Sequence, residues 1–353
     1  MSLYPALRPL LFCLPPERAH RAAICALQMG FGPCAEPSPL SLRTRVAGLD
    51  FANPVGLSAG FDKNAECYAG TLRAGFGHVE IGTVTPLPQP GNPQPRIFRL
   101  VEQRAIINRL GFNNEGAAVA AARLTRRNGP GIVGGNIGKN KDSMDANADY
   151  TSAMRTLYPL VDYITANISS PNTPGLRALQ AGDALLSLVR ALHSARASLV
   201  ESGAPHRPIF VKIAPDCDDE MLDAIAQVAL DEKIDGLIVS NTLVARDSIA
   251  GCALAHETGG LSGVPMFAKS TEILQKIYRL TQGEIPLIGV GGIASAEDAY
   301  EKIRAGASLV QLYTALVYQG FGLVNRINRG LADLLARDGF SHVAQAVGTA
   351  SSG

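Results

Sequence analysis

The sequence has almost no excess of charge of one sign. Its 353 residues include 32 lysines and arginines and 31 aspartates and glutamates, which leave a formal net charge of +1. A protein that binds nucleic acid usually carries a strongly basic face, so the bulk charge predicts no nucleic-acid partner. With 46% apolar and 18% charged residues, the composition is typical of an enzyme with a large core.

Paired cysteines and metal-binding motifs are also missing. The six cysteines are scattered without a Cys-x-x-Cys pair, and none of the six histidines belongs to a His-Glu-x-x-His motif. The pattern indicates neither a disulfide framework nor a zinc site, so we expect no metal. A reducing cytosol suits such a chain best.

No apolar run approaches the roughly 18 residues that a membrane-spanning helix needs. The first 45 residues are nevertheless unusual, because five arginines face only two glutamates there. Apolar residues recur every three or four positions from Tyr4 to Leu14, and a second helix is predicted from Glu17 to about Met29, after Pro15-Pro16. We predict two amphipathic helices over residues 1–38 that lie on a membrane without crossing it. The alternative is a helical hairpin that packs on its own domain.

After residue 38 the pattern changes to short β-rich runs separated by segments of helical length. We predict eight strands: Val55–Ala59, His78–Val84, Gly131–Ile137, Tyr163–Ile168, Pro208–Ala214, Gly236–Ser240, Pro286–Val290 and Leu309–Tyr313. Predicted helices lie between most of them and after the last: Ala65–Ala74, Glu115–Arg127, Ala184–Glu201, Asp218–Leu230, Lys269–Thr281, Ala296–Ala305 and Leu323–Arg337.

Eight apolar strands alternating with helices predict an α/β fold, a closed (β/α)₈ TIM barrel over residues 39–340. A small N-terminal helical hairpin domain would precede it, and a C-terminal tail would cover residues 341–353. A doubly wound open sheet is the competing fold. It usually has a Gly-x-Gly-x-x-Gly after its first strand, where this chain has Ala59-Gly-Phe-Asp-Lys63.

Polar residues stand where the predicted strands end. Catalytic groups of such barrels gather at the carboxyl ends of the strands, because the loops there converge on one mouth. The residues at these ends are Lys63, Thr83, Asn136, Asn167, Lys212, Asn241, Gly291 with Gly292, and Tyr313 with Thr314. Each alone is equally well explained as a turn former or a solvated lysine, but together they predict a ligand site.

The segment from Thr165 to Arg177 contains the densest group of neutral hydrogen-bonding residues. Its members are Asn167, Ser169, Ser170, Asn172 and Thr173. Such a group at a strand end suggests a planar, polar ligand, although asparagine, serine and two prolines also suit an ordinary turn.

Two glycine-rich turns predict an anion site. Gly259-Gly-Leu-Ser-Gly263 precedes one predicted helix and Gly289-Val-Gly-Gly-Ile-Ala-Ser295 precedes the next. The loops after the seventh and eighth strands are where barrels of this kind hold a phosphate, so a phosphorylated cofactor is indicated. Lys212, inside an apolar strand, needs an anionic partner, which a reduced flavin would supply. A Schiff-base lysine is the alternative use.

Several longer motifs carry a resemblance. They are Ser58-Ala-Gly-Phe-Asp-Lys-Asn64, Glu80-Ile-Gly-Thr-Val-Thr-Pro-Leu-Pro-Gln-Pro-Gly-Asn92, Asn108-Arg-Leu-Gly-Phe-Asn-Asn114, Asn136-Ile-Gly-Lys-Asn140, Asn167-Ile-Ser-Ser-Pro-Asn-Thr-Pro-Gly-Leu-Arg177, Val211-Lys-Ile-Ala-Pro-Asp216, Gly259-Gly-Leu-Ser-Gly263 and Gly289-Val-Gly-Gly-Ile293 followed by Gln311-Leu-Tyr-Thr314. From about Tyr4 to Gly339 the chain resembles the class 2, quinone-dependent and membrane-associated dihydroorotate dehydrogenases. The resemblance implies one FMN per chain and oxidation of (S)-dihydroorotate to orotate in pyrimidine biosynthesis.

The resemblance also implies a role for each matching residue. The general base of class 2 falls on Ser170, where the soluble class 1 enzymes have cysteine. FMN would be held by Ala59, Gly60, Lys63, Thr83, Asn136, Asn167, Lys212, Ser240, Gly263, Gly291, Gly292, Tyr313 and Thr314. Dihydroorotate and orotate would be held by Lys63, Asn108, Arg109, Leu110, Gly111, Phe112, Asn167, Asn172, Asn241 and Thr242.

A membrane quinone is the electron acceptor that the resemblance implies. His20, Arg99 and Tyr313 would be the polar groups at the inner end of a quinone tunnel formed by the N-terminal hairpin. The expected location is peripheral, on the cytoplasmic face of the cell membrane. Two rivals remain. A tRNA-modifying flavin barrel should show a basic face and usually a catalytic cysteine, and a non-catalytic membrane-docked binding barrel would not need Ser170 or the four asparagines.

Overall fold

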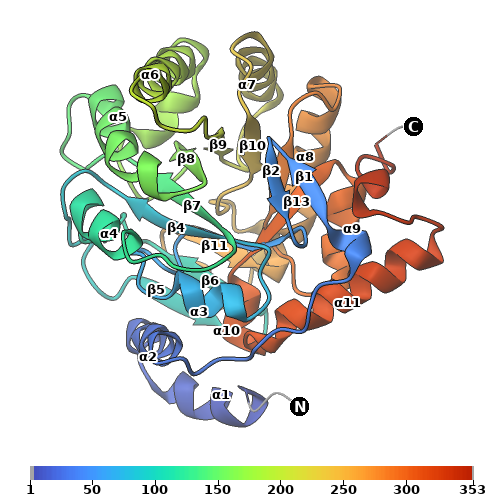
Figure 1. The fold of residues 1–353 in the computed structure, drawn as a ribbon. Coiled ribbons are helices and arrows are strands. Elements are labelled where there is room, and N and C mark those ends of the chain that lie inside the picture. The colour runs from blue at the N-terminus through green and yellow to red at the C-terminus, as the bar shows by residue number, and fades with distance from the viewer. Residues whose placement is uncertain (1–3, 352–353) are drawn as a thin grey trace.

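A closed barrel of eight parallel strands forms the centre of the molecule. The computed structural model describes residues 4–351 (Figure 1). The barrel strands are β3 (Val55–Leu57), β4 (His78–Val84), β7 (Ile132–Ile137), β8 (Tyr163–Asn167), β9 (Ile209–Ile213), β10 (Gly236–Val239), β12 (Leu287–Val290) and β13 (Ala307–Leu312). They pair in this order, and β13 closes the barrel on β3. All eight predicted strands and the (β/α)₈ fold are confirmed.

The helices surround the barrel. They are α3 (Tyr68–Arg73), α4 (Ala117–Leu124), α5 (Ala146–Leu157), α6 (Gly182–Glu201), α7 (Asp219–Asp231), α8 (Phe267–Leu280), α9 (Ala296–Arg304) and α11 (Gly322–Arg337). The predicted helix from Ala65 begins only at Tyr68. Ala65 adopts a positive φ of 57°, and the Asp62 carboxylate accepts from the N–H groups of Glu66 and Cys67 at 2.7 and 2.8 Å, so this stretch forms a turn.

Helix α5 was not predicted, although its sequence carries the helical signals. Asp145 caps its N-terminus by accepting from Ala148 N. Tyr150, Ala153, Met154 and Leu157 recur at helical spacing, and all four are buried against the barrel. This spacing and the Asp145 cap are an ordinary amphipathic-helix signal, so the sequence was sufficient to predict α5.

The amino-terminal end of the barrel is closed by a hairpin that was not predicted either. Its strands are β1 (Thr44–Val46) and β2 (Leu49–Phe51). Phe51 packs edge-on against His78 at the start of β4, with ring centroids 5.4 Å apart. Tyr163 and Phe210 continue this cluster inside the barrel. The hairpin therefore plugs one end, and the strands' carboxyl ends remain for a ligand.

At the carboxyl ends a small antiparallel sheet is added to the barrel. Its strands are β5 (Ile97–Leu100), β6 (Ala105–Asn108) and β11 (Gly260–Gly263), in the order β11-β6-β5. They come from two separate insertions, after β4 and after β10. Their apolar faces pack into a separate cluster that includes Leu100, Ile107 and Met266. This sheet brings Asn108 over the barrel mouth.

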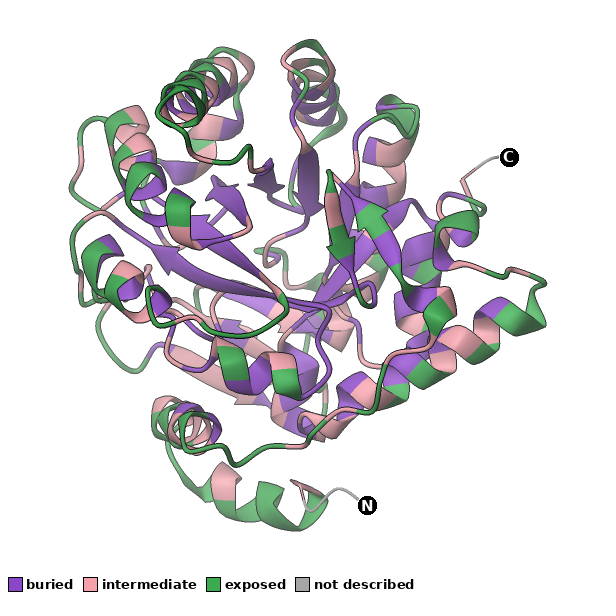
Figure 2. Cartoon of the chain, in the orientation of Figure 1, coloured by how far each residue is buried: buried purple, intermediate pink, exposed green. Residues whose placement is uncertain are grey.

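Two helices precede the barrel, as the sequence predicted. Helix α1 (Tyr4–Cys13) and helix α2 (Pro16–Gln28) meet at a proline corner and lie near α3, α10 (Thr314–Gln319) and the small sheet (Figure 1). Helix α2 buries Ile24 and Leu27, whereas α1 has no buried residue and is largely exposed (Figure 2). Among residues 4–351, no helix is both long and apolar enough to cross a bilayer. The predicted domain limits at residues 38 and 340 stay predictions.

Candidate active site

One cavity opens at the carboxyl ends of the barrel strands. Most of the residues predicted for the cofactor and the substrate line it: Ala59, Gly60, Lys63, Thr83, Asn108, Leu110, Gly111, Phe112, Asn167, Ser170, Asn172, Lys212, Ser240, Asn241, Thr242, Gly263, Gly291, Gly292, Tyr313 and Thr314. They come from the ends of seven barrel strands and from the small sheet. The residues predicted from the strand ends and those implied by the resemblance therefore line the same cavity.

Two of the residues predicted for the cofactor and the substrate, Asn136 and Arg109, do not line this cavity. Asn136 lies one layer deeper, where its Nδ2 donates to the buried Glu80 carboxylate at 2.8 Å and its Oδ1 accepts from Thr83 Oγ1 at 2.6 Å. Asn136 therefore fixes the orientation of the Thr83 hydroxyl, which lines the cavity. Arg109 points away: it forms an ion pair with Glu257 at 2.6 Å and stacks over the Phe98 ring at 4.5 Å.

Lys212 and Lys63 bring two ammonium groups into the cavity wall. Lys212 Nζ donates to Ser58 Oγ at 3.2 Å, and Lys63 Nζ donates to the Gly60 carbonyl at 2.8 Å. Burial lowers the pKa of Lys212, although the charge of Glu80 acts in the opposite direction. Burial, helped by the nearby Arg96 charge, lowers the pKa of Lys63 to about 8. One buried and one partly buried ammonium group, with one neutral partner each, suit an anionic ligand.

The asparagine side chains are held in fixed orientations by one another. Asn167 Nδ2 donates to Thr83 Oγ1 at 2.9 Å, which turns Asn167 Oδ1 toward Asn241 Nδ2 at 3.3 Å. Asn241 Nδ2 also donates to Ser169 Oγ at 3.0 Å. Asn172 Nδ2 reaches across to the Asn108 carbonyl at 3.1 Å. Amides ordered in this way present both donors and acceptors to a planar polar ring.

Ser170 is buried in the loop that follows β8. Its Oγ accepts from Asn172 N at 3.2 Å, and the residue lines the cavity. Three residues further on, Thr173 Oγ1 is buried without a hydrogen-bond partner among residues 4–351. A buried hydroxyl of this kind usually has a ligand or water as its partner. The loop therefore has unused hydrogen-bonding capacity beside Ser170.

The glycine turns lie on another side of the cavity. Gly263, Gly291 and Gly292 have φ values of 103°, 116° and 78°, which side chains rarely adopt. A Cβ on Gly292 would lie only 2.5 Å from Phe267 Cβ, so a glycine is required there for close packing. Helix α10 begins beside these turns at Thr314, where the first N–H groups lack partners within the helix. This side is suited to a phosphate.

The three residues predicted for the quinone come from helix α2 (His20), from β5 (Arg99) and from the cavity wall (Tyr313). The His20 ring packs on Phe61 at 5.0 Å and lies 6.3 Å from Tyr313, which also lines the cavity. Burial and the nearby Lys63 charge lower the pKa of His20 to about 4. Arg99 lies farther out, where it donates to the Leu14 carbonyl and covers the Phe12 ring at 4.8 Å.

Some lining residues escaped the sequence analysis. Ser58 immediately precedes a predicted strand-end residue and could have been included on that ground. Gln311 lies inside β13, at alternate spacing to Tyr313. Arg104 and Ser262 belong to the small sheet and its turn, which were not predicted. Ser262 Oγ accepts from Thr314 Oγ1 at 2.8 Å, which ties this sheet to the phosphate side.

The fold and the cavity define a class of protein: a (β/α)₈-barrel enzyme whose site, at the carboxyl mouth, is shaped for anionic and planar ligands. A family model described as "Dihydroorotate dehydrogenase" matches residues 41–335. The chain belongs to the dihydroorotate dehydrogenase family. The resemblance inferred from the motifs is confirmed.

Individual relatives match along nearly the whole chain. A protein of Parvibaculum lavamentivorans named dihydroorotate dehydrogenase (quinone) is 55% identical over 350 residues, 99% of each chain. A protein of Azorhizobium caulinodans with the same name is 53% identical over 353 residues, again 99% of each chain. Among solved structures, DHODH of Eimeria tenella in complex with ferulenol matches with a TM-score of 0.92 at 41% identity, over 96% of both chains.

Proposed function

We propose that this protein oxidises (S)-dihydroorotate to orotate and passes the electrons to a membrane quinone, as a step of pyrimidine biosynthesis. The observation that carries the proposal is the composition of the cavity. Two lysine ammonium groups, that of the buried Lys212 and that of the partly buried Lys63, converge there with ordered asparagines and a buried serine. Two relatives named dihydroorotate dehydrogenase (quinone) are 55% and 53% identical to this chain over 99% of its length.

The cavity residues fit FMN as the cofactor. Lys212 would face the edge of the flavin ring that gains negative charge, and the turns at Gly263, Gly291 and Gly292 with Thr314 would hold the phosphate. Ala59, Gly60, Lys63, Thr83, Asn167, Ser240 and Tyr313 would contribute the remaining contacts, with Asn136 supporting Thr83 from below. When bound, FMN supplies the two-electron redox chemistry that amino-acid side chains lack.

The substrate would lie on the side of the cavity lined by the asparagines. Asn108, Asn167, Asn172 and Asn241 offer donors and acceptors that match the imide and carboxylate edges of dihydroorotate, and Lys63 offsets its negative charge. Leu110, Gly111, Phe112 and Thr242 shape the same side. Arg109 acts on this side only through its neighbours, because its guanidinium is engaged with Glu257.

Ser170 is the proposed general base. Its Oγ would take the proton from C5 of dihydroorotate, and a serine needs help for this because its hydroxyl is a weak base. The buried, unpaired Thr173 Oγ1 in the same loop is a suitable site for a water that carries the proton away.

Quinone would approach between helices α1 and α2. His20, Phe61 and Tyr313 form the inner wall of this route, and Arg99 stands near its outer part. The exposed side chains of Leu7, Leu10 and Leu14 would enter the lipid boundary, so that the protein lies on the membrane surface. The face that we propose is the cytoplasmic one.

A steady-state assay with purified protein in detergent tests the proposal. We expect orotate to form from dihydroorotate when a quinone is the acceptor, and only negligibly when NAD⁺ replaces the quinone. Orotate formation with NAD⁺ at an equal rate would reject the quinone assignment. No orotate with any acceptor, in protein that contains FMN, would reject the proposed substrate.

A further inference from the structure

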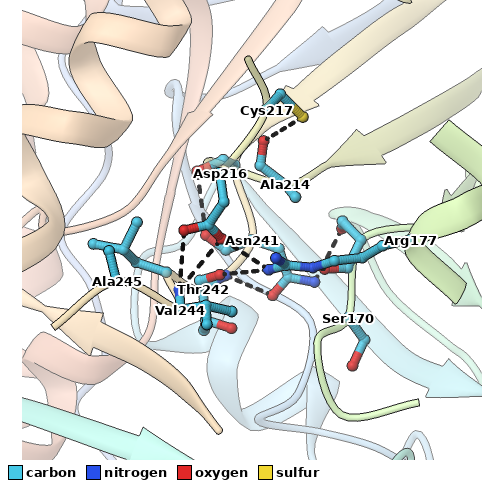
Figure 3. A network of polar contacts seen from close by, with 12 residues as sticks. Ser170, Arg177, Ala214, Asp216, Cys217, Asn241, Thr242, Val244 and Ala245 are labelled. Atoms are coloured by element: carbon cyan, nitrogen blue, oxygen red, sulfur yellow. Dashed lines mark hydrogen bonds and ion pairs between the residues drawn. The ribbon is translucent and has the colours of Figure 1, made fainter. Parts of the chain in front are cut away.

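One arginine outside the cavity joins three of the loops at the barrel mouth. Arg177 lies in the short 3₁₀ helix Leu176–Gln180, after the loop that carries Ser170. Its Nε donates to the Ser169 carbonyl at 3.2 Å, and its Nη2 donates to the Thr242 carbonyl at 3.3 Å. The same Nη2 lies 3.0 Å from Asp216 Oδ2 (Figure 3).

Asp216 fixes the arginine from the loop after β9. Its two carboxylate oxygens also accept from Val244 N, at 3.1 and 3.2 Å (Figure 3). The carboxylate therefore contacts both the arginine and the loop after β10. Together, Arg177 and Asp216 connect the loops that follow β8, β9 and β10, which are neighbours in the barrel.

The two carbonyls that Arg177 binds belong to residues directly beside the proposed chemistry. Ser169 precedes Ser170, and Thr242 follows Asn241. Asn241 Nδ2 in turn donates to Ser169 Oγ at 3.0 Å. Neither Arg177 nor Asp216 lines the cavity. The pair therefore acts on the cavity through the residues that it positions: Thr242 directly, and Ser170 and Asn241 as neighbours of the two bound carbonyls.

The loop between Ser170 and Arg177 needs such a fixed point. It contains Pro171 and Pro174, and Gly175 adopts a φ of 69°. Pro174 and Gly175 are exposed, so the tip has little packing to hold it. Beyond Arg177, Gln180 Oε1 accepts from Ala214 N at 2.8 Å. The loop is thus attached to the β9 side beyond Arg177 and to Asn108 through Asn172, while its Pro174–Gly175 tip is exposed.

We propose that Arg177, held by Asp216, is a positioning residue that fixes where Ser170 and Asn241 stand in the substrate side of the cavity. The proposal rests on the proposed function for the identity of that substrate. A planar guanidinium with several donors in a fixed fork can serve a carboxylate and two carbonyls at once. A lysine could keep the ion pair, but it would not hold both carbonyls in the same geometry.

The test compares variants of this pair with a matched ion pair elsewhere. The variants are Arg177→Gln, Arg177→Lys, Asp216→Asn and the double variant Arg177→Gln/Asp216→Asn. The control is Arg196→Gln, because Arg196 pairs with Asp235 at the amino-terminal ends of the strands. Like Asp216, Asp235 also accepts from a backbone N–H, that of Ile209 at 2.9 Å.

The first readout is anaerobic flavin reduction by dihydroorotate, with the dissociation constant of orotate measured on the same preparations. We expect Arg177→Gln and Asp216→Asn to slow reduction at saturating substrate by about 10-fold to 100-fold, the scale of a small misplacement of reacting groups. Orotate affinity should fall less than the rate. Arg177→Lys should recover part of the rate, and the double variant should be no slower than Arg177→Gln, since the pair acts as one unit.

The second readout is limited proteolysis within residues 171–180, which needs no catalysis. Arg177→Gln and Asp216→Asn should be cut faster than wild type, and Arg196→Gln should not. Unchanged cleavage together with a wild-type reduction rate would overturn the proposal, as would an equal rate loss in Arg196→Gln. If dihydroorotate fails to reduce the wild-type flavin, the proposed function is wrong, and the cleavage comparison alone then decides whether the pair holds the loop.

Discussion

Ser170 combines burial with an almost complete lack of strong partners. Its hydroxyl accepts only from the Asn172 N–H among the described residues, and no ionised side chain contacts it. A serine in this setting stays protonated until substrate and solvent arrange a path for its proton.

Replacing Ser170 by alanine should separate binding from chemistry. Ser170→Ala should retain FMN and bind orotate, while flavin reduction by dihydroorotate slows by roughly 100-fold or more, the usual scale for a lost general base. Anaerobic stopped-flow absorbance measures this rate. Ser170→Cys should restore part of it with a pH profile shifted downward, because a thiol ionises more readily than a hydroxyl. A near-wild-type rate for the alanine variant would exclude Ser170 as the base.

Lys302 is a buried cation beneath the glycine turns. Its Nζ donates to Ser270 Oγ at 2.8 Å and Thr271 Oγ1 at 3.0 Å, and it lies 5.0 Å from the centre of the Phe267 ring. Ser270 Oγ in turn donates to the Gly291 carbonyl at 3.1 Å. Burial lowers the pKa of Lys302 to about 7, although Glu301 and Asp298 act in the opposite direction.

This lowered pKa predicts a pH dependence of stability. Between about pH 7 and pH 10.5 the unfolded chain keeps the Lys302 proton while the folded chain has lost it, so this group makes the free energy of unfolding rise with pH. The slope is at most about 1.4 kcal/mol per pH unit. Urea unfolding of wild type and Lys302→Met with saturating FMN, from pH 7 to pH 10, should show wild type gaining relative to the variant. A difference that does not change with pH would contradict the prediction.

The sequence analysis identified those cavity-lining residues that stand at the ends of barrel strands. Lys63, Thr83, Asn167, Lys212 and Asn241 were found because parallel strands place their carboxyl ends at one mouth. Arg104 and Ser262 were missed because the small sheet is made of short strands from two insertions, without a repeating helix to mark them. Arg109 was carried over from the resemblance, and no local pattern indicated its ion pair with Glu257, which is 148 residues away in the chain.

Among the elements, α1 and α2 differ in how they are attached. Helix α2 buries two residues, and its Glu17 forms an ion pair at 2.6 Å with Arg96, a guanidinium that is itself almost fully buried. Helix α1 is attached through polar contacts, including Arg8 Nη1 to the Tyr318 carbonyl at 3.2 Å. Its apolar residues Leu7 and Leu10 are 49% and 69% exposed. Helix α1 therefore keeps its apolar side available for a lipid surface.

The double variant Leu7→Ser/Leu10→Ser should weaken membrane binding without unfolding the protein. Both side chains are exposed, so the stability should change little. We expect co-sedimentation with liposomes to fall several-fold, from the loss of buried apolar area at the lipid boundary. Turnover with a long-chain quinone in vesicles should fall with it, while reduction by dihydroorotate stays unchanged. Met144→Ser is the matched control, because Met144 is fully exposed on a distant loop. Equal liposome binding by wild type and the double variant would remove the membrane role of α1.

The strands that the sequence analysis missed share a physical reason. Those of the β1–β2 hairpin and of the small antiparallel sheet are only three or four residues long, so their periodicity is weak, whereas α5 carries a regular helical pattern. The eight barrel strands are buried on both faces and therefore read as continuous apolar runs. Burial by neighbouring elements, which local sequence does not encode, stabilises the weaker ones.

The whole molecule places two routes around one cavity. The residues proposed for the substrate line the cavity with Ser170 at the mouth of the barrel, and the proposed quinone route from α1 and α2 would reach the same cavity at Tyr313. A single cofactor between them would exchange electrons with both ligands. We therefore expect dihydroorotate and quinone to act in turn on one flavin.

Double-mixing stopped flow tests this claim most directly. Purified protein with bound FMN is mixed anaerobically with one equivalent of dihydroorotate, and quinone is added after a delay. We predict that the yellow colour bleaches with one orotate formed per flavin, and that quinone then restores it at a rate fast enough to sustain steady-state turnover. Failure of dihydroorotate to bleach the flavin, or a bleached flavin that quinone cannot reoxidise, would contradict the account.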